Sequence, residues 1–465
     1  MTPDKEQKIA SEYIYNNSLI IAGAGSGKTT TLLLKIQFLI ENNVKENEIL
    51  VISFTNETVN NFKKKCKYNI DIMTFHKLAS TVIQCKKEIV DDKFLETCII
   101  NFFNNISEKL KHKIYNIFSS KLYSDNNYQS NIESNSATSI TSYFYSVIKQ
   151  IKSNQIDLNN CDISKFNNNE KIILYCVNRI ISHYNNELSE NNFIDFDNMI
   201  IEATNIINNN EYTCNYKYVL VDEYQDISKI RLNFLKAILK INNAILTAVG
   251  DDFQSIYGFS GSNIGLFYDF EKHFHNSKIF YIHTSYRCPK KIIKKAGKFV
   301  MKNPKQIKKE IVSNSNIRGK IVKIHARSFK YELIKIIKKY RNSSKNILIL
   351  GRNNFDINFY IDNKNKINDS YIVYKNKTYP NIRYLTVHKS KGLEADITVI
   401  INLSDGRLGF PSYSDNRLID KLVSKDENYK HAEERRLFYV ALTRCKIKTY
   451  LIINRKHPSE FIREI

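Results

Sequence analysis

The chain has 465 residues, of which 42% are hydrophobic and 25% charged, and its formal net charge is +23. This length fits two to four domains, and the apolar content excludes a chain that is disordered throughout. No apolar run approaches the roughly 20 residues that span a bilayer, and the N-terminal segment lacks the pattern of a signal peptide. We therefore expect a cytoplasmic protein with no membrane partner, in a bacterium or, for a viral protein, in the host-cell cytoplasm or virus factory.

The positive charge is concentrated in one part of the chain. From Lys290 to Lys345 there are 19 Lys or Arg residues and only two acids, Glu310 and Glu332. A basic cluster of this kind predicts a polyanionic partner. The alternative is the codon bias of an AT-rich genome, since Asn, Ile and Tyr are also abundant and Trp is absent.

The eight cysteines are scattered along the chain, and none forms a C-x-x-C pair. This spacing excludes the usual zinc and iron–sulfur signatures. We expect reduced thiols, most of them buried, as in other proteins of reducing compartments.

Residues 1–85 alternate strand-like and helix-like stretches. Ser18–Ala22 is a short apolar run, a glycine-rich loop follows it, and Thr30–Ile40 has the length of a helix. A second apolar strand is expected at Leu50–Phe54. Strand, loop and helix in this order form the context that a phosphate-binding P-loop requires.

The rest of the chain divides into three further segments. Residues 86–194 have helical spacing, for example at Phe94, Cys98 and Phe102, and we interpret them as a helical insertion with a polar loop at 123–136. Residues 195–280 return to the first α/β domain. Residues 281–465 form a second α/β domain. The expected strands are Tyr218–Val221, Ala244–Val249, Lys320–Ile324, Asn346–Leu350, Arg383–Val387, Thr398–Asn402 and Thr449–Ile453.

The glycine-rich loop is the first candidate site. Its candidate nucleotide-binding residues are Ala22, Gly23, Ala24, Gly25, Ser26, Gly27, Lys28, Thr29 and Thr30. Backbone N–H groups of such a loop surround phosphate oxygens, and the helix after it adds its positive N-terminal end. Lys28 would contact the β- and γ-phosphates, and the Thr29 hydroxyl would bind Mg²⁺. The alternative is a tight structural turn.

A second half of such a site follows the strand Tyr218–Val221. Asp222 comes directly after this strand, where it would hold Mg²⁺ through water. Glu223 is placed to orient and deprotonate an attacking water. The alternative is a pair of surface acids at the end of a strand.

The segment Asp222-Glu223-Tyr224-Gln225-Asp226 resembles motif II of the UvrD/Rep family of superfamily 1 helicases. The P-loop of that family commonly has alanine at the position of Ala22. Other segments resemble further family motifs in the same order: Gln7 before the loop, Ser53–Thr58 (Ia), Thr74–Ala79 (Ib), Phe193–Asp197, Val249–Gly261 (III), Thr284–Arg287 (IV), Thr386–Asp396 (V) and Glu433–Arg444 (VI). The resemblance covers nearly the whole chain.

The resemblance implies an α/β fold with two RecA-like P-loop domains, parallel sheets, and ATP and Mg²⁺ as cofactors. Gln7 would read the adenine edge, Tyr286 would stack on adenine, and Glu394 would hydrogen-bond the ribose. The catalytic residues would be Lys28, Asp222, Glu223, Gln254, Arg287 and Arg444. Without the resemblance, both arginines would be interpreted as ordinary surface residues.

The resemblance also implies a track for single-stranded nucleic acid. Aromatic side chains in a basic groove stack on bases, and the family stacks bases at the positions of Phe54, Tyr257 and Phe259. The alternative is that these rings belong to the core. Further candidates for contacts with DNA are Thr55, His76, Arg352 and His388.

The chain departs from the family pattern in three places. Ser260 stands where many members have arginine, and Thr30 stands where many have an arginine beside the adenine pocket. The large insertion of the second domain is absent or reduced to a hairpin near 353–382. In this the layout is more similar to the helicase IV branch of the family.

These observations predict an ATP-dependent 3′–5′ DNA helicase or translocase acting in replication, repair or recombination. Its partners would be single-stranded DNA and tailed duplex DNA, and it would be monomeric or loaded by another protein. Two alternatives remain: a translocase that displaces proteins without unwinding duplex, and a DNA-binding protein that has lost its motor. RNA is the less favoured substrate.

Overall fold

The computed structural model describes residues 3–84, 87–122, 132–406, 408–413, 417–423 and 429–465. A six-stranded parallel sheet forms the centre of the first domain. Its strands lie in the order β3-β2-β6-β7-β1-β8. Their bounds are β1 Ser18–Ala22, β2 Ile49–Ser53, β3 Asp71–Thr74, β6 Tyr218–Val221, β7 Ile245–Gly250 and β8 Lys278–Ile282. Because β8 pairs with β1 along its length, the first sheet extends two residues past the expected boundary at 280.

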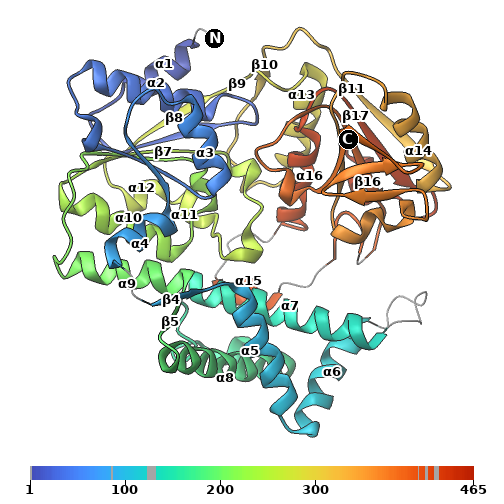
Figure 1. Cartoon of the computed structure of the whole chain (residues 1–465), viewed down its shortest axis with the longest axis horizontal. Coiled ribbons are helices and arrows are strands. Elements are labelled where there is room, and N and C mark those ends of the chain that lie inside the picture. The colour runs from blue at the N-terminus through green and yellow to red at the C-terminus, as the bar shows by residue number, and fades with distance from the viewer. Residues whose placement is uncertain (1–2, 85–86, 123–131, 407, 414–416, 424–428) are drawn as a thin grey trace.

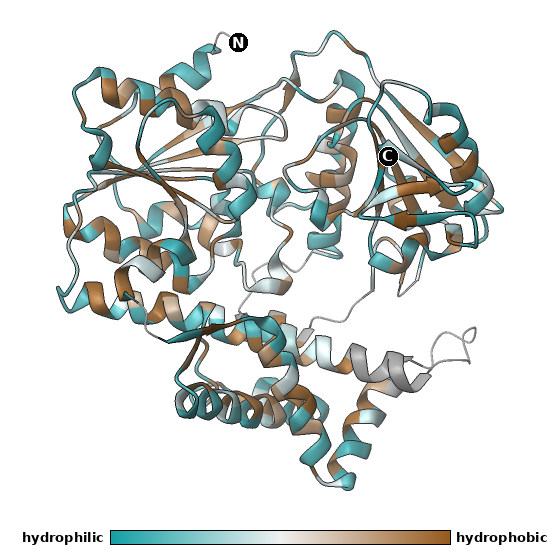
Figure 2. Ribbon diagram, in the orientation of Figure 1, coloured by the Kyte–Doolittle hydropathy of each residue, from teal (hydrophilic) through white to brown (hydrophobic). Residues whose placement is uncertain are grey.

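Successive side chains of β1 belong to different cores, because strand residues alternate between the two faces of a sheet. Ile20 and Ala22 face the core beneath α1 (Lys5–Glu12), α2 (Lys28–Glu41) and α3 (Asn56–Lys65). Leu19 and Ile21 face the core beneath α4 (Phe75–Ile83), α9 (Phe196–Asn208) and α10 (Lys229–Ile241). With both faces covered, β1 is buried throughout, and Figure 2 shows hydrophobic strands between helices with hydrophilic outer sides.

The expected helical insertion lies below the two domains in Figure 1. Its helices are α5 (Asp92–Asn105), α6 (Glu108–Leu122), α7 (Ile132–Ser153) and α8 (Asn168–Glu190). Two short parallel strands, β4 (Glu88–Val90) and β5 (Phe193–Asp195), connect it to the first domain.

The polar loop expected at 123–136 is wrong for its last five residues, because α7 begins at Ile132. Residues 123–131 lie outside the described part. Asn and Ser are poor helix formers, so the local sequence favours a loop here. Further along the same helix, Phe144, Val147 and Ile148 are buried in the core of the insertion, and this packing outweighs the local preference.

The second domain contains a seven-stranded sheet in the order β11-β17-β16-β12-β15-β14-β13. The bounds are β11 Lys320–Ala326, β12 Ile347–Gly351, β13 Lys366–Asn368, β14 Tyr371–Tyr374, β15 Lys377–Thr386, β16 Ala395–Leu403 and β17 Cys445–Asn454. One face is covered by α13 (Lys290–Val300) and α16 (Ala432–Leu442), and the other by α14 (Phe329–Tyr340). The short strands β9 (Thr284–Ser285) and β10 (Val312–Ser313) pair beside the P-loop.

Where the family has its large second insertion, this chain forms a small antiparallel extension of the sheet. Strands β13, β14 and β15 pair in sequence after the 3₁₀ segment Asn354–Tyr360. This extension overlaps the segment 353–382, where the sequence predicts a reduced insert. In the described part of the chain, no helix combines the length and apolarity that crossing a bilayer needs.

A segment of the second domain packs into the helical insertion. Helix α15 (Arg417–Val423) lies in the connection from β16 to α16, yet it buries Leu418, Ile419 and Leu422 in the core of the insertion (Figure 1). Lys421 Nζ contacts both carboxylate oxygens of Glu170 on α8, at 2.8 and 2.7 Å. The insertion is thus attached to both domains.

Replacing Leu418 and Leu422 together with alanine is expected to detach α15 from the insertion. Burying each leucine contributes roughly 2–5 kcal/mol by the measured cost of such truncations, so local opening becomes more frequent. Hydrogen exchange should become at least about tenfold faster in α15 and stay unchanged in α13. Leu408→Ala, at a leucine that is 62% exposed in the same connection, is the matched control. Unchanged exchange in α15 would show that this contact does not hold the helix.

Candidate functional site

The glycines of the P-loop allow the second domain to lie directly against it. Gly25 and Gly27 have φ values of 73° and 81°, which L side chains rarely adopt. A Cβ atom on Gly25 would lie 2.5 Å from Cβ of Arg287, and one on Gly23 would lie 2.3 Å from Cδ1 of Ile311. The Tyr286 N–H also donates to the Gly25 carbonyl at 2.8 Å. Motif IV therefore packs on the loop through backbone contacts.

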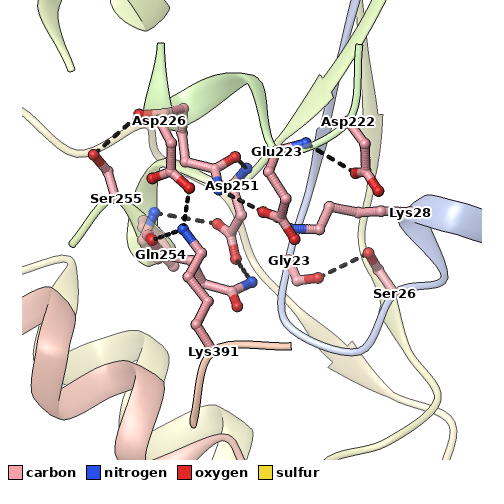
Figure 3. Close-up of polar contacts among 12 residues, drawn as sticks. Gly23, Ser26, Lys28, Asp222, Glu223, Asp226, Asp251, Gln254, Ser255 and Lys391 are labelled. Carbon is pink, nitrogen blue, oxygen red and sulfur yellow. Dashed lines mark hydrogen bonds and ion pairs between the residues drawn. The ribbon is translucent and has the colours of Figure 1, made fainter. Parts of the chain in front are cut away.

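Lys28 at the start of α2 reaches the acids at the end of β6. Its Nζ donates to Oε2 of Glu223 at 2.7 Å, and the Glu223 N–H donates to Oδ1 of Asp222 at 2.9 Å (Figure 3). Burial opposes the charge of Glu223, but Lys28 and Lys391 outweigh it and hold its pKa at about 2. Burial and the neighbouring Glu223 raise the pKa of Asp222 to about 7. The expected catalytic lysine and acids are thus in direct contact.

Asp222 and Thr29 offer the oxygen ligands that Mg²⁺ prefers. Thr29 is the second residue of α2, next to Lys28, and Asp222 is 2% exposed. A bound divalent cation would compensate the carboxylate charge that burial disfavours, so the donor set fits Mg²⁺. In the described residues, no cluster of three or more His, Cys, Asp or Glu side chains forms another candidate metal site.

Gln254 connects motif III to the arginine of motif VI. Its Nε2 donates to Oδ2 of Asp251 at 2.6 Å, and its Oε1 accepts from Nη2 of Arg444 at 2.8 Å. Arg444 is 1% exposed, and burial together with the nearby Arg287 lowers its pKa to about 10. Lys309 donates to Asp251 at 2.7 Å and also contacts Asp252, so a buried lysine of the second domain holds motif III in place.

Arg287 points to the same region from motif IV. Its Nε donates to Oε2 of Glu394 at 2.9 Å, and Lys446 pairs with the other oxygen of Glu394. Glu394, expected to bind the ribose, therefore holds two cations in this structure. Although burial opposes its charge, the contacts with Lys446 and Arg287 lower the pKa of Glu394.

The expected adenine-binding residues meet at the N-terminus of the chain. Gln7 Nε2 donates to the Ser26 carbonyl at 3.0 Å, and Gln7 and Asp4 cap α1 reciprocally. The Tyr286 hydroxyl donates to Oδ2 of Asp4 at 2.7 Å. Gln7 and Tyr286 thus flank the P-loop on one side, whereas Thr30 is exposed on α2.

Tyr257, Phe259 and His388 form an aromatic cluster where the two domains meet. The ring centroids of Tyr257 and Phe259 are 6.1 Å apart, and those of Phe259 and His388 are 5.2 Å apart. Phe259 is 45% exposed, and its carbonyl accepts from the Ser146 hydroxyl of α7 at 3.3 Å. Burial, Arg352 and Lys391 lower the pKa of His388 to about 3, so this ring is neutral.

Lys391 of motif V joins the nucleotide residues to this aromatic cluster. Its Nζ donates to the carbonyl of Gln254 at 2.8 Å and pairs with Asp226 at 2.5 Å (Figure 3). The same Nζ lies 4.8 Å from the ring centroid of Tyr257. One side chain thus contacts motif II, motif III and the aromatic cluster.

The remaining track candidates do not join this cluster directly. Phe54 is half-buried against the first core, with the Arg231 guanidinium 5.4 Å from its ring centroid, which favours the core alternative. Thr55 is exposed and caps α3. His76 packs on Phe196 with ring centroids 5.0 Å apart, and burial lowers its pKa to about 3.

Arg352 is paired within the second domain. Its Nε donates to Oε1 of Glu434 at 2.8 Å, and Glu434 is buried at the start of α16. A contact with DNA would compete with this ion pair.

Comparison with known proteins gives two matches along the chain. Residues 3–275 match the UvrD/REP helicase N-terminal domain, and residues 361–456 match the UvrD-like helicase C-terminal domain. The first match alone covers more than half of the chain. The chain belongs to the UvrD/Rep helicase family.

Individual UvrD/Rep helicases resemble the chain over most of its length. DNA helicase IV of Escherichia coli (strain K12) is 27% identical over 96% of this chain and 67% of its own length. The ATP-dependent DNA helicase Rep of Buchnera aphidicola subsp. Schizaphis graminum is 28% identical, over 87% and 60%. A probable DNA helicase II homolog of Mycoplasma capricolum is 30% identical, over 72% and 46%. The chain spans about half to two thirds of these relatives.

The sequence did not predict the roles of Lys391 and Lys309, which hold parts of the site together. Lys391 lies inside the segment that resembles motif V of the UvrD/Rep family, so its position carried a signal that was not assigned a role. Lys309 lies in the lysine-rich stretch and has no local feature that separates it from its neighbours. The seven cysteines in the described ranges are free thiols, as expected, and Cys85 lies outside them.

Proposed function

We propose that this UvrD/Rep family protein is an ATP-dependent DNA helicase or translocase that moves 3′ to 5′ on single-stranded DNA. The observation that carries the proposal is the continuous set of contacts from Lys28 and Glu223 through Gln254 and Lys391 to Tyr257. Gln225 completes it, because its amide contacts Glu223 and accepts from the Asp251 N–H at 2.9 Å. A change at the phosphates would therefore reach the aromatic cluster.

In this proposal, the P-loop amides and Lys28 bind the ATP phosphates, and Glu223 orients the attacking water and accepts its proton. Mg²⁺, when bound by Thr29 and Asp222, would neutralise charge on the phosphates. Arg287 and Arg444 stabilise the charge that develops on the transferring phosphoryl group. Tyr286 and Gln7 hold the adenine. Glu394 is free for the ribose only after its pairs with Arg287 and Lys446 rearrange.

At the aromatic cluster, Tyr257 and Phe259 stack on bases of the single strand, and the neutral ring of His388 adds a third flat surface. Thr55, His76 and Arg352 would contribute secondary contacts, whereas Phe54 packs against the first core. The names of bacterial DNA helicases among the relatives support DNA as substrate. We further propose a cytoplasmic location and a role in replication, repair or recombination. We expect a monomer, or one loaded by a protein partner.

The test combines ATP hydrolysis with unwinding of labelled duplexes that carry a 3′ or a 5′ single-stranded tail. We expect DNA-stimulated hydrolysis, its loss in Lys28→Ala, and unwinding only of the 3′-tailed duplex. Unwinding only from the 5′ tail would contradict the polarity. Hydrolysis with displacement of a protein block but no unwinding would favour the translocase, and no hydrolysis with DNA binding retained would favour a protein without a motor.

Phe259→Ala is expected to weaken binding of single-stranded DNA by about 10- to 100-fold, because stacking on one aromatic ring contributes ~1–3 kcal/mol per base. Fluorescence anisotropy with a labelled oligonucleotide measures this. Tyr281→Ala is the matched control, since Tyr281 is 39% exposed against 45% for Phe259 but lies on the edge strand β8. If the two variants bind single-stranded DNA with equal affinity, Phe259 does not stack on a base.

A further inference from the structure

Of the basic residues in segment 290–345, Lys309 is the one that contacts the nucleotide site, and none packs on the rings of the aromatic cluster. Its 19 basic and two acidic residues carry 17 of the chain's 23 net positive charges in 56 of 465 residues. Codon bias acts along the whole chain and does not concentrate charge in this way. The concentration therefore needs an explanation that is specific to this surface.

Helix α13 presents its lysines on one side. Its exposed residues are Lys290, Lys291, Lys294, Lys295 and Lys298, and its buried residues are Ile292, Ile293, Ala296, Gly297, Phe299 and Val300. In the described part of the chain, none of these five lysines lies within ion-pair distance of a carboxylate. The outer side of α13 is thus a row of unpaired ammonium groups.

The row continues around the edge of the second sheet. β11 is the edge strand, and its Lys320 and Lys323 are exposed. α13 and α14 both pack against β11, which brings their lysines to this edge. Burial and the charge of Lys295 lower the pKa of Lys323. On the other face of the sheet, α14 exposes three more lysines. We call these residues the basic belt: Lys290, Lys291, Lys294, Lys295, Lys298, Lys320, Lys323, Lys335, Lys338 and Lys339.

The belt opposes the stability of the element that carries most of it. In α13, Lys290–Lys294, Lys291–Lys295 and Lys294–Lys298 are like-charged pairs at i,i+4, and such pairs destabilise a helix. Lys290 and Lys291 also lie in the first turn, where the helix dipole favours acids, and no acid is present there. A row of charges that only kept the surface hydrated would not need this arrangement.

Protection of the sheet edge explains only part of the belt. Exposed lysines on an edge strand prevent pairing with another chain, which accounts for Lys320 and Lys323. The lysines of α13 and α14 lie on helices and do not protect an edge. Both helices pack against β11 from opposite faces of the sheet, so their lysines flank those of the edge strand.

We propose that the basic belt binds the phosphate backbone of DNA, at a surface separate from the aromatic cluster. α13, β11 and α14 lie in the upper part of the second domain in Figure 1, whereas the 3₁₀ turn that carries Phe259 packs on α7 at the bottom. The belt holds a stretch of DNA other than the strand on the aromatic rings. The choice of DNA as the polyanion rests on the proposed function.

The experiment measures binding of the full chain to a blunt duplex and to a single strand at increasing KCl concentration. The belt variant carries Lys291→Gln, Lys294→Gln and Lys298→Gln, and a second variant carries Lys335→Gln, Lys338→Gln and Lys339→Gln. Glutamine keeps helix propensity close to that of lysine, so both variants should fold. The control removes the same charge from exposed lysines of the first domain, as Lys45→Gln, Lys240→Gln and Lys278→Gln.

Each lost phosphate contact should reduce the slope of log K against log salt by about 0.9 for duplex DNA, so three contacts correspond to a reduction of about 2–3 and roughly tenfold weaker binding. We expect this loss in both belt variants and less than twofold change in the control. Loss with the duplex, the single strand or both supports the belt and identifies the form of DNA that it holds. Affinities equal to the control with both forms would overturn the proposal.

Hydrolysis of ATP separates this proposal from the proposed function. The belt variants should keep the ATPase rate that a saturating single strand stimulates, because none of their lysines contacts the nucleotide residues. If the unmodified chain binds the blunt duplex with belt-dependent affinity but hydrolyses no ATP, the proposed function fails and the belt stands. If it hydrolyses ATP and the belt variants bind as the control does, the belt fails alone.

Discussion

Arg287→Ala is expected to lower the rate of DNA-stimulated ATP hydrolysis by about 10³-fold or more, the lower end of what such arginines contribute. Arg287 belongs to the second domain, yet the P-loop glycine at position 25 brings it within contact of the phosphate-binding loop. Its guanidinium would stabilise charge that develops only in the transition state, so kcat should fall while ATP binding changes little. Steady-state hydrolysis and binding of a fluorescent ATP analogue measure the two effects.

The control for this prediction is Lys446→Ala. Lys446 pairs with the same carboxylate as Arg287, so its loss also leaves Glu394 with one partner fewer. If Arg287 acts only by holding Glu394, both variants should lose activity to a similar degree. A fall confined to Arg287→Ala assigns the effect to the arginine itself, whereas an activity within tenfold of the unmodified chain would remove Arg287 from the catalytic set.

Several strands could be predicted from the sequence because a strand that is buried on both faces consists almost entirely of apolar residues. β1 was placed at Ser18–Ala22 as observed, since a fully buried parallel strand is an uninterrupted apolar run bounded by polar residues. The order of motifs then predicted which strand ends would meet. Lys28 and Glu223, 195 positions apart, are in contact as a P-loop and a following acidic strand require.

Contacts between distant elements were less predictable. The docking of α15 onto the insertion depends on three apolar side chains in a seven-residue helix, and local periodicity does not identify what covers them. Lys309 looks like its neighbours, and only packing decides that it is buried between Asp251 and Asp252. The pairing of Glu394 with Arg287 and Lys446 likewise depends on how β9, β16 and β17 meet in space.

Glu223→Gln is expected to lower ATP hydrolysis by roughly 10²–10⁴-fold, the usual contribution of a general base. Glutamine has nearly the same shape and can accept the hydrogen bond from Lys28, but it cannot take a proton from water. Single-turnover hydrolysis at saturating ATP and DNA is the measurement, because it reports the chemical step alone. Binding of ATP should persist, since the P-loop and Lys28 are unchanged.

Asp226→Asn is the matched control for Glu223→Gln. It also replaces one motif II carboxylate with an amide, but Asp226 pairs with Lys391 and does not contact Lys28. Its loss should therefore weaken the coupling between DNA binding and hydrolysis more than the basal rate. If Asp226→Asn slows the chemical step as much as Glu223→Gln does, loss of a motif II charge explains both effects, and Glu223 has no separate role as the base.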